Sequence, residues 1–327
     1  PESTQPDCPA LAVGGQGRYI RIVADLRSAL ARLEAELSSV LFGQERVVRE
    51  LLATVVAGGH ALLEGLPGLG KTLLARAFSE ASGLSYRRIQ FTPDLLPADV
   101  TGTEIFDGRV EGGFVFRPGP IFAQVVLADE INRATPKTQS ALLEAMQEAA
   151  VTAAGQRYPL PQPFLVLATQ NPLELEGTYP LPEAQLDRFM SKIHVAAPAR
   201  STWIRILNEE PATPKPVEGL DLLAAREESQ RVVVSSAAIE ALANTAQLAQ
   251  EDKRLRMALS PRGAKAWLAL ARALAYLAGR AHLDWDDLRS AARPALSHRL
   301  LLTEEAQFEG VAVETVLQDL LRRTMAK

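Results

Sequence analysis

The chain has 327 residues, of which 47% are hydrophobic, a composition that suits two globular domains with packed cores. Thirty-five Lys and Arg residues against 39 Asp and Glu residues give a net charge of −4, which predicts no broad basic surface for nucleic acid. The longest apolar stretch, residues 267–278, is interrupted by Arg272 and is too short to span a bilayer. We therefore expect a globular protein that does not insert into membranes.

Cysteine and histidine usage argues against disulfide and transition-metal chemistry. Cys8 is the single cysteine, so no intramolecular disulfide can form, and this suits a reducing cytoplasm. The four histidines are far apart in the sequence and lack the spacing of metal ligands. We expect them to be surface or core residues of a cytoplasmic protein.

The N-terminal part divides into a leader and two predicted helices. Residues 1–18 hold three prolines, three glycines and little apolar surface, which predicts a flexible leader. From Ile20 to Val40 apolar residues recur at helical spacing, which predicts a packing helix. A turn at Gly43 and Gln44 leads to a second helix, which ends near residue 58.

A short apolar strand, residues 61–64, is followed by a glycine-rich loop and then a helix over residues 71–82. From Gly65 to Thr72 the loop fits G-x-x-x-x-G-K-[ST], whose backbone N–H groups cradle phosphate. Lys71 would reach the β- and γ-phosphate oxygens, Thr72 would bind Mg²⁺, and the helix N-terminus adds positive charge. ATP and Mg²⁺ are thus the predicted ligands. The candidate nucleotide-binding residues in this stretch are Gly65, Pro67, Gly68, Leu69, Gly70, Lys71, Thr72 and Leu73. Gly43 and Gln44 either border the adenine or only connect two helices, and their spacing fits both interpretations equally.

A second strand is predicted over residues 86–91, and an insertion of hairpin-forming pieces follows over residues 92–120. Glycine pairs and an Asp-Gly step mark its turns. Insertions of this length are often working surfaces, but a purely structural hairpin fits the sequence as well.

The next apolar strand, beginning at Val125, delivers two adjacent carboxylates, Asp129 and Glu130. Ligands of open α/β sheets bind at the carboxyl ends of the strands. Asp129 would hold Mg²⁺ directly or through water, and Glu130 would accept the proton of the water that attacks the γ-phosphate. An Asp-Glu pair is usually a solvated turn, but the strand before it and the phosphate loop favour catalysis here.

A helix over residues 136–148 and a hairpin over 150–160, turning near Gly155, precede another apolar strand over 164–168. That strand ends in Thr-Gln-Asn-Pro, which places Asn171 at the same edge of the sheet as the carboxylates. Its amide could hydrogen-bond both the water and the γ-phosphate. The alternative is an asparagine that only forms a turn before proline.

Two arginines further along are candidate nucleotide ligands. Arg188 lies on a short predicted helix, residues 182–189, before a strand at 192–195; a surface ion pair is its alternative role. After an acidic, proline-bearing segment at 209–218 the chain reads as helix throughout, over 219–230, 236–250, 261–279 and 284–299. Ser260 would cap the third of these helices, and Arg262 in its first turn suggests a nearby anion, unless it is an ordinary surface arginine.

With these residues collected, the sequence resembles the AAA+ ATPases and, among them, the MoxR family. The resemblance runs from about Leu41 to the C-terminus. Its most specific stretches are residues 65–72, Phe-Thr-Pro-Asp-Leu-Leu-Pro-Ala-Asp at 91–99, Leu-Ala-Asp-Glu-Ile-Asn-Arg-Ala at 127–134, Gln-Ser-Ala-Leu-Leu-Glu-Ala-Met at 139–146, and 168–189.

The resemblance implies an α/β fold: a three-layer αβα P-loop NTPase core with a five-stranded parallel sheet in the order 5-1-4-3-2, followed by an all-α lid domain. The core would span residues 19–197, with a helix-2 insert at 92–120 and a hairpin at 150–163, and the lid would span 198–327. By family analogy Lys71 and Thr72 belong to Walker A, and Asp129 and Glu130 to Walker B. Asn171 would be sensor 1, Arg188 an arginine finger acting on the neighbouring subunit, and Arg262 sensor 2. Arg133 is a further candidate for the neighbouring site.

The resemblance also implies homo-oligomeric rings, usually hexamers, that act as chaperone-like motors on protein partners, commonly with a von Willebrand factor A domain protein. A magnesium-chelatase-like motor subunit is an alternative from the same superfamily. A nucleic-acid motor or an ATP-regulated scaffold is a third, which the near-neutral charge disfavours.

Overall fold

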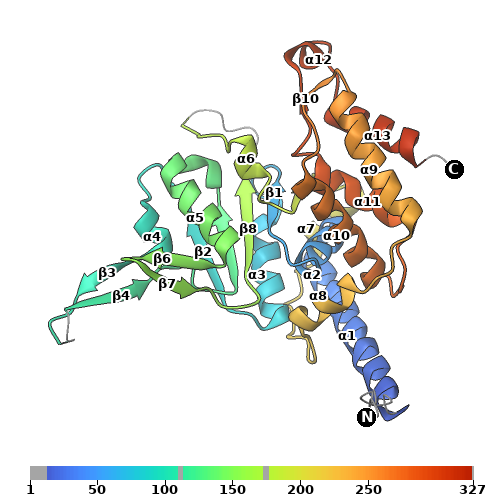
Figure 1. The fold of residues 1–327 in the computed structure, drawn as a ribbon. Helices are drawn as coiled ribbons and strands as arrows, with labels where there is room; N and C mark the ends of the chain where they lie inside the picture. The colour runs from blue at the N-terminus through green and yellow to red at the C-terminus, as the bar shows by residue number, and fades with distance from the viewer. Residues whose placement is uncertain (1–12, 110–112, 172–176, 326–327) are drawn as a thin grey trace, which may run out of the picture.

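The computed structural model describes residues 13–109, 113–171 and 177–325. Its centre is a parallel sheet of five strands in the order β2-β5-β8-β1-β9, which matches the order expected from the resemblance (Figure 1). The strands are β1 (Ala61–Glu64), β2 (Tyr86–Gln90), β5 (Val125–Asp129), β8 (Leu165–Gln170) and β9 (Ser191–His194). In this order the carboxyl ends of β5, β8 and β1 lie next to one another.

Successive side chains along each strand point to opposite faces of the sheet, so the hydrophobic core is divided between the two faces. Leu63 and Leu127 belong to the hydrophobic cluster on one face, and Leu62 and Val126 to the cluster on the other. Helices α1 (Val13–Val40), α2 (Glu45–Val56) and α3 (Lys71–Ser82) contribute to the first cluster, and α5 (Pro136–Glu148) contributes to the second. The result is the predicted three-layer αβα core.

Two antiparallel hairpins project from the core where the sequence predicted them (Figure 1). The first joins β3 (Gly102–Phe106) to β4 (Phe114–Pro118) after the short helix α4 (Pro97–Thr101). The second joins β6 (Ala150–Ala153) to β7 (Gln156–Pro159) through Ala154 and Gly155, both at positive φ, as a two-residue hairpin turn requires. Phe116 stacks on Tyr158 at 4.1 Å between ring centroids, so the two hairpins contact each other.

The C-terminal half is a bundle of helices that packs beside the sheet (orange to red in Figure 1). Its helices are α8 (Leu222–Gln230), α9 (Ser236–Glu251), α10 (Pro261–Leu277), α11 (Trp285–Leu296), α12 (Glu304–Phe308) and α13 (Val313–Thr324). The buried side chains of α10 and α11 join the same hydrophobic cluster as α2 and α3, so the lid core is continuous with one layer of the sheet domain. Among the described residues, no helix is long and apolar enough to cross a membrane.

The structure differs from the sequence-based expectation in three places. Helix α1 begins at Val13, so the helix reaches into the predicted 1–18 leader, and residues 1–12 lie outside the described residues. The C-terminal half is not purely helical, because β10 (Leu255–Met257) pairs antiparallel with β11 (Leu301–Leu302); such short strands leave no clear period in the sequence. Helix α7 (Arg200–Asn208) was not predicted, and it has no buried residue.

Candidate active site

The phosphate loop connects β1 to α3, as its spacing predicted. Gly68 and Gly70 adopt φ of 80° and 87°, a left-handed conformation that a residue with a side chain rarely adopts. Helix α3 begins at Lys71, directly after Gly70. The Lys71 Nζ donates hydrogen bonds to the carbonyl oxygens of Gly65 at 2.6 Å and Leu66 at 2.8 Å. The ammonium group therefore lies over the loop, on the side where phosphate would bind.

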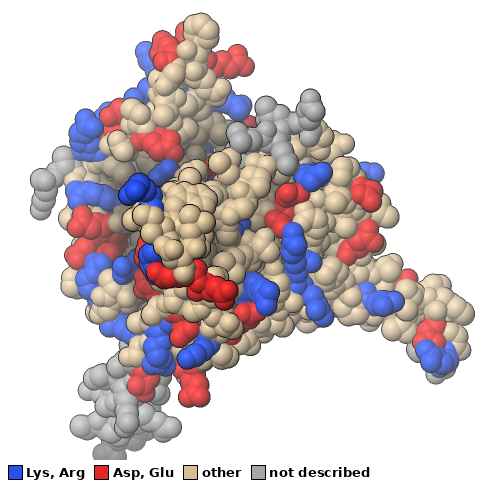
Figure 2. Space-filling view, turned by 180° about the vertical axis from the view of Figure 1, so that it is seen from behind, with Lys and Arg blue, Asp and Glu red and all other residues tan. Residues whose placement is uncertain are grey.

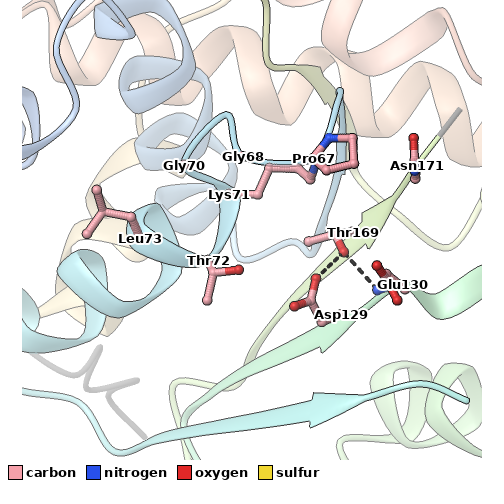
Figure 3. Close-up of a pocket in the computed structure, with 10 residues that line it drawn as sticks. All are labelled: Pro67, Gly68, Gly70, Lys71, Thr72, Leu73, Asp129, Glu130, Thr169 and Asn171. Carbon is pink, nitrogen blue, oxygen red and sulfur yellow. Dashed lines mark hydrogen bonds between the residues drawn. The ribbon is translucent and has the colours of Figure 1, made fainter. Parts of the chain in front are cut away.

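The loop, the ends of two strands and the start of α3 enclose a cavity of about 460 Å³ (Figure 3). Its lining residues are Pro67, Gly68, Gly70, Lys71, Thr72, Leu73, Asp129, Glu130, Thr169 and Asn171. Burial lowers the pKa of Lys71, and the nearby carboxylates of Asp129 and Glu130 oppose that shift. The cavity thus combines one ammonium group, two carboxylates and the hydroxyl and amide groups needed to orient a phosphate chain.

Asp129 is nearly buried at the end of β5, and other side chains fix its orientation. Arg88 donates to the Asp129 Oδ2 through Nε at 3.0 Å and a terminal guanidinium nitrogen at 2.7 Å. The Thr169 hydroxyl donates to the Asp129 Oδ1 at 2.6 Å. Figure 3 shows the Thr72 hydroxyl on the side of the cavity that faces Asp129. Both oxygen groups are hard ligands of the kind that Mg²⁺ prefers.

Glu130 follows in an unusual backbone conformation, with φ of 56°. Its N–H donates to the Thr169 hydroxyl at 2.8 Å (dashed in Figure 3), and its Oε2 accepts from Gln90 at 2.7 Å and Arg133 at 3.0 Å. A non-glycine residue at positive φ persists only where its surroundings hold it. Here a buried hydroxyl holds the backbone and two donors hold the carboxylate, which presents Glu130 to the cavity as a candidate base.

Three of these supporting residues were not singled out from the sequence. Thr169 lies two residues before Asn171 and joins both carboxylate residues through one hydroxyl. Arg88 and Gln90 are on β2, whose register places Gln90 opposite Asp129. These two residues could have been found from the sequence. The expected strand order makes β2 and β5 neighbours, so polar residues at the end of β2 must lie beside Asp129. Asn171 is nearly buried and lines the cavity, as predicted.

An adjoining apolar pocket of about 210 Å³ continues from the phosphate cavity, with which it shares Gly68, Gly70 and Leu73. Leu69 and Gln44 also line it, and the Gln44 amide donates to the Ala196 carbonyl at 3.0 Å. The remaining lining residues are Val40, Leu41, Phe42, Pro198, Trp203, Ile206, Glu209 and Pro211. A flat aromatic ring with apolar faces, such as adenine, suits this lining. Gly43 does not line the pocket; a Cβ there would meet the Thr202 side chain at 2.5 Å, so Gly43 has a packing role.

Neither predicted arginine lines the phosphate cavity of its own chain. Arg188 follows the short helix α6 (Glu183–Leu186) and lines a separate cavity with residues of α5. Arg262 lies in the first turn of α10, where the Ser260 hydroxyl accepts from the Gly263 N–H at 3.0 Å, so the predicted cap is present. A terminal nitrogen of Arg262 lies 3.9 Å from the Asp187 Oδ2.

The histidines behave as expected for core and surface residues. His298 is buried and His60 is half-buried, and desolvation lowers the pKa of both, that of His60 to about 4. His194 and His282 are exposed. No group of three or more His, Cys, Asp or Glu residues within the described ranges could hold a metal ion by itself.

Comparisons with known proteins agree with this geometry. Residues 60–191 match the model of the ATPase family associated with various cellular activities (AAA), and residues 247–320 match that of the AAA lid domain. The chain is 41% identical over 304 residues to the uncharacterized protein YeaC of Bacillus subtilis, covering 91% of this chain and 94% of that protein. It is 40% identical over 307 residues to chaperone MoxR1 of Mycobacterium tuberculosis, covering 90% and 81% respectively. A solved structure of a Cytophaga hutchinsonii protein superposes with a TM-score of 0.85 at 36% identity, covering 94% of this chain and 98% of that one. The chain therefore belongs to the MoxR family of AAA ATPases, and it is an ATP-hydrolysing enzyme.

Proposed function

We propose that the chain hydrolyses ATP with Mg²⁺ as part of a homo-oligomeric ring, hexameric by family analogy, and uses the energy to remodel protein partners. One observation carries the catalytic part: Lys71, Thr72, both strand-end carboxylates and Asn171 converge on a single cavity. Lys71 would balance the charge of the β- and γ-phosphates, and Asn171 would orient the attacking water. Glu130 would take the proton of that water.

The oxygen donors in the cavity suit a Mg²⁺ ion that arrives with the nucleotide. Mg²⁺ in ATPase sites takes one or two protein oxygens and completes its shell with phosphate oxygens and water. Thr72 supplies a hydroxyl and Asp129 a carboxylate on facing sides of the cavity. When bound, the ion would neutralise charge that develops on the phosphates. Asp129 would remain aligned for it through its bonds to Arg88 and Thr169.

The position of Arg188 supports assembly into a ring. Its side chain lies outside the phosphate cavity of its own chain, in a cavity formed with α5. A finger supplied by a neighbouring subunit contributes about 10³–10⁵ to the rate where it has been measured. Arg188 would then complete the neighbour's site, while Arg262 would serve its own chain's nucleotide. Arg133 donates to its own Glu130, which favours a role within its own site.

The β3–β4 hairpin is the proposed contact for a protein client or a von Willebrand factor A domain partner. Phe106 and Phe114, at its end, are 72% and 62% exposed and pack edge to face. Figure 2 shows the hairpin projecting from the body, with most of its surface neither acidic nor basic. Such a surface suits a protein rather than nucleic acid. The similar protein MoxR1 of Mycobacterium tuberculosis is a chaperone, which supports a role directed at proteins. We propose the cytoplasm as the place where this chain acts.

Subunit mixing tests the catalytic ring. Arg188→Ala should bind ATP normally and barely hydrolyse it, and Glu130→Gln should bind ATP without turnover. In mixed rings a Glu130→Gln subunit supplies an intact finger to the intact base of an Arg188→Ala neighbour, so activity should return. Arg323→Ala, an exposed arginine of α13 far from the site, is the matched control and should retain full activity. If native mass spectrometry confirms mixed rings that stay inactive, Arg188 does not act in trans.

A further inference from the structure

The segment that carries Arg188 is bound to the lid by a buried arginine. Arg299, just after α11, is 3% exposed and donates from Nε to the Asp187 Oδ1 at 2.6 Å. Its terminal nitrogens donate to the backbone carbonyls of Asp187 at 3.0 Å and Phe189 at 2.7 Å. They also donate to the Met190 carbonyl at 3.1 Å. The residues on both sides of Arg188 are therefore fixed to one lid side chain.

Other lid residues reinforce this attachment. The buried His298 places Nε2 at 3.0 Å from the Phe189 carbonyl, and Arg256 of β10 donates to Glu183 of α6 at 2.9 Å. A Cβ at Gly263 would lie 2.7 Å from the Arg299 side chain, so the glycine in the first turn of α10 permits the close approach of Arg299. The start of α10 and the Arg188 segment are thus packed against the same guanidinium.

The Asp187 carboxylate lies between two lid arginines, Arg299 and Arg262. Its Oδ1 binds the buried Arg299 tightly, whereas its Oδ2 lies 3.9 Å from the half-exposed Arg262. The Ser260 hydroxyl that caps α10 also lies 3.4–3.5 Å from this carboxylate. The long contact to Arg262 is the one that a phosphate group could replace, because the buried Arg299 has no other anionic partner among the described residues.

From this geometry we propose that Asp187 is a positioning residue that links the lid, through Arg299 and Arg262, to the placement of the finger Arg188. A phosphate that draws Arg262 toward the chain's own nucleotide moves the start of α10, and Asp187 and Arg299 transmit this movement to the adjacent finger. Each subunit would thereby set its neighbour's rate according to its own nucleotide. The inference rests on the proposed function, since it requires Arg188 to act in trans.

Placing Asp187→Asn in either partner of the mixed ring tests this link. The donor is the Glu130→Gln subunit, which supplies the finger, and the acceptor is the Arg188→Ala subunit, which supplies the active site. Asn keeps an oxygen that can accept from Arg299 but removes the charge. Misplacing a reacting group by about 1 Å costs on the order of 10²-fold in rate. The substitution in the donor should therefore lower the restored kcat roughly 10- to 100-fold below that with the substitution in the acceptor, with little change in KM for ATP.

Asp187→Asn should destabilise the donor and the acceptor subunit to the same extent. If Asp187 has only a structural role, the restored activity should therefore fall equally with either placement. Equal effects, in rings that native mass spectrometry shows to be mixed, would overturn the role of Asp187. The outcome is separate from that of the proposed function: if the parent mixture without Asp187→Asn shows no restored activity, the trans finger itself is wrong. Should Asp187→Asn not fold, Asp187→Glu keeps the charge for Arg299 and displaces the carboxylate by one methylene. The same donor-specific fall is expected from it, and equal effects would again refute the proposal.

Discussion

Replacing Thr169 by Val should disturb the arrangement of the active-site carboxylates while leaving ATP binding close to normal. Thr169 is 1% exposed, and its hydroxyl donates to Asp129 at 2.6 Å and accepts from the Glu130 N–H at 2.8 Å. Valine keeps the shape but leaves the half-buried Glu130 N–H without this acceptor and the nearly buried Asp129 Oδ1 without this donor, and each loss costs about 1–3 kcal/mol. Asp129 keeps its bonds to Arg88. We therefore expect the free energy of unfolding to fall by about 2–3 kcal/mol.

The larger effect should be on turnover. Without the hydroxyl, Glu130 loses the contact that fixes its backbone at a φ of 56°, and its carboxylate should move away from the attacking water. Displacements of about 1 Å cost on the order of 10²-fold, so kcat should fall roughly 10- to 100-fold. Binding of ATP should remain close to normal, because Thr169 forms no hydrogen bond to Lys71 or the phosphate loop.

Thr169→Ser is the matched control, since it keeps the hydroxyl and removes one methyl group, which costs about 1 kcal/mol. Urea unfolding measures stability, calorimetry measures ATP affinity, and phosphate release at saturating ATP measures turnover. If Thr169→Val turns over ATP as fast as Thr169→Ser, the hydroxyl does not position the carboxylates. A large loss of ATP affinity would instead show that Thr169 acts in nucleotide binding.

Lys71→Ala should abolish ATP binding in calorimetry, because it removes the cation that balances the β- and γ-phosphates; tight binding would contradict this role. Glu130→Gln should bind ATP and fail to hydrolyse it, so unaltered phosphate release would exclude Glu130 as the base. His60 is half-buried, and desolvation lowers its pKa in the folded protein from 6.5 to about 4, so unfolding takes up a proton at pH values between these two. The free energy of unfolding should therefore be unaffected by His60 above pH 6.5 and should fall by about 3 kcal/mol as the pH falls to 4. Urea titrations at different pH values should show this fall in the parent protein and not in His60→Gln. Replacing Phe106 and Phe114 by Ser should leave ATP turnover unchanged and weaken binding of an identified protein partner; undiminished binding would show that the hairpin is structural.

The sequence predicted the parts of the site that depend on local order. The phosphate loop needs glycines, a lysine and a hydroxyl in adjacent positions, so its spacing alone indicates its geometry. Asp129, Glu130 and Asn171 follow apolar strands, and parallel strands carry such residues to one edge of the sheet. The order of the strands came from the family resemblance and is confirmed by the structure.

Tertiary structure alone decided which residues hold these groups in place. Thr169 supports two carboxylate residues some 40 positions away, and Arg299 binds Asp187 across 112 positions. The sequence around Thr169 resembles any strand end, and Arg299 resembles any arginine after a helix. Their roles follow from burial, which removes water as an alternative partner and makes each polar group depend on the few donors and acceptors that the fold brings within reach. A chain therefore shows its local motifs directly, whereas the contacts that position them exist only once distant segments are packed together.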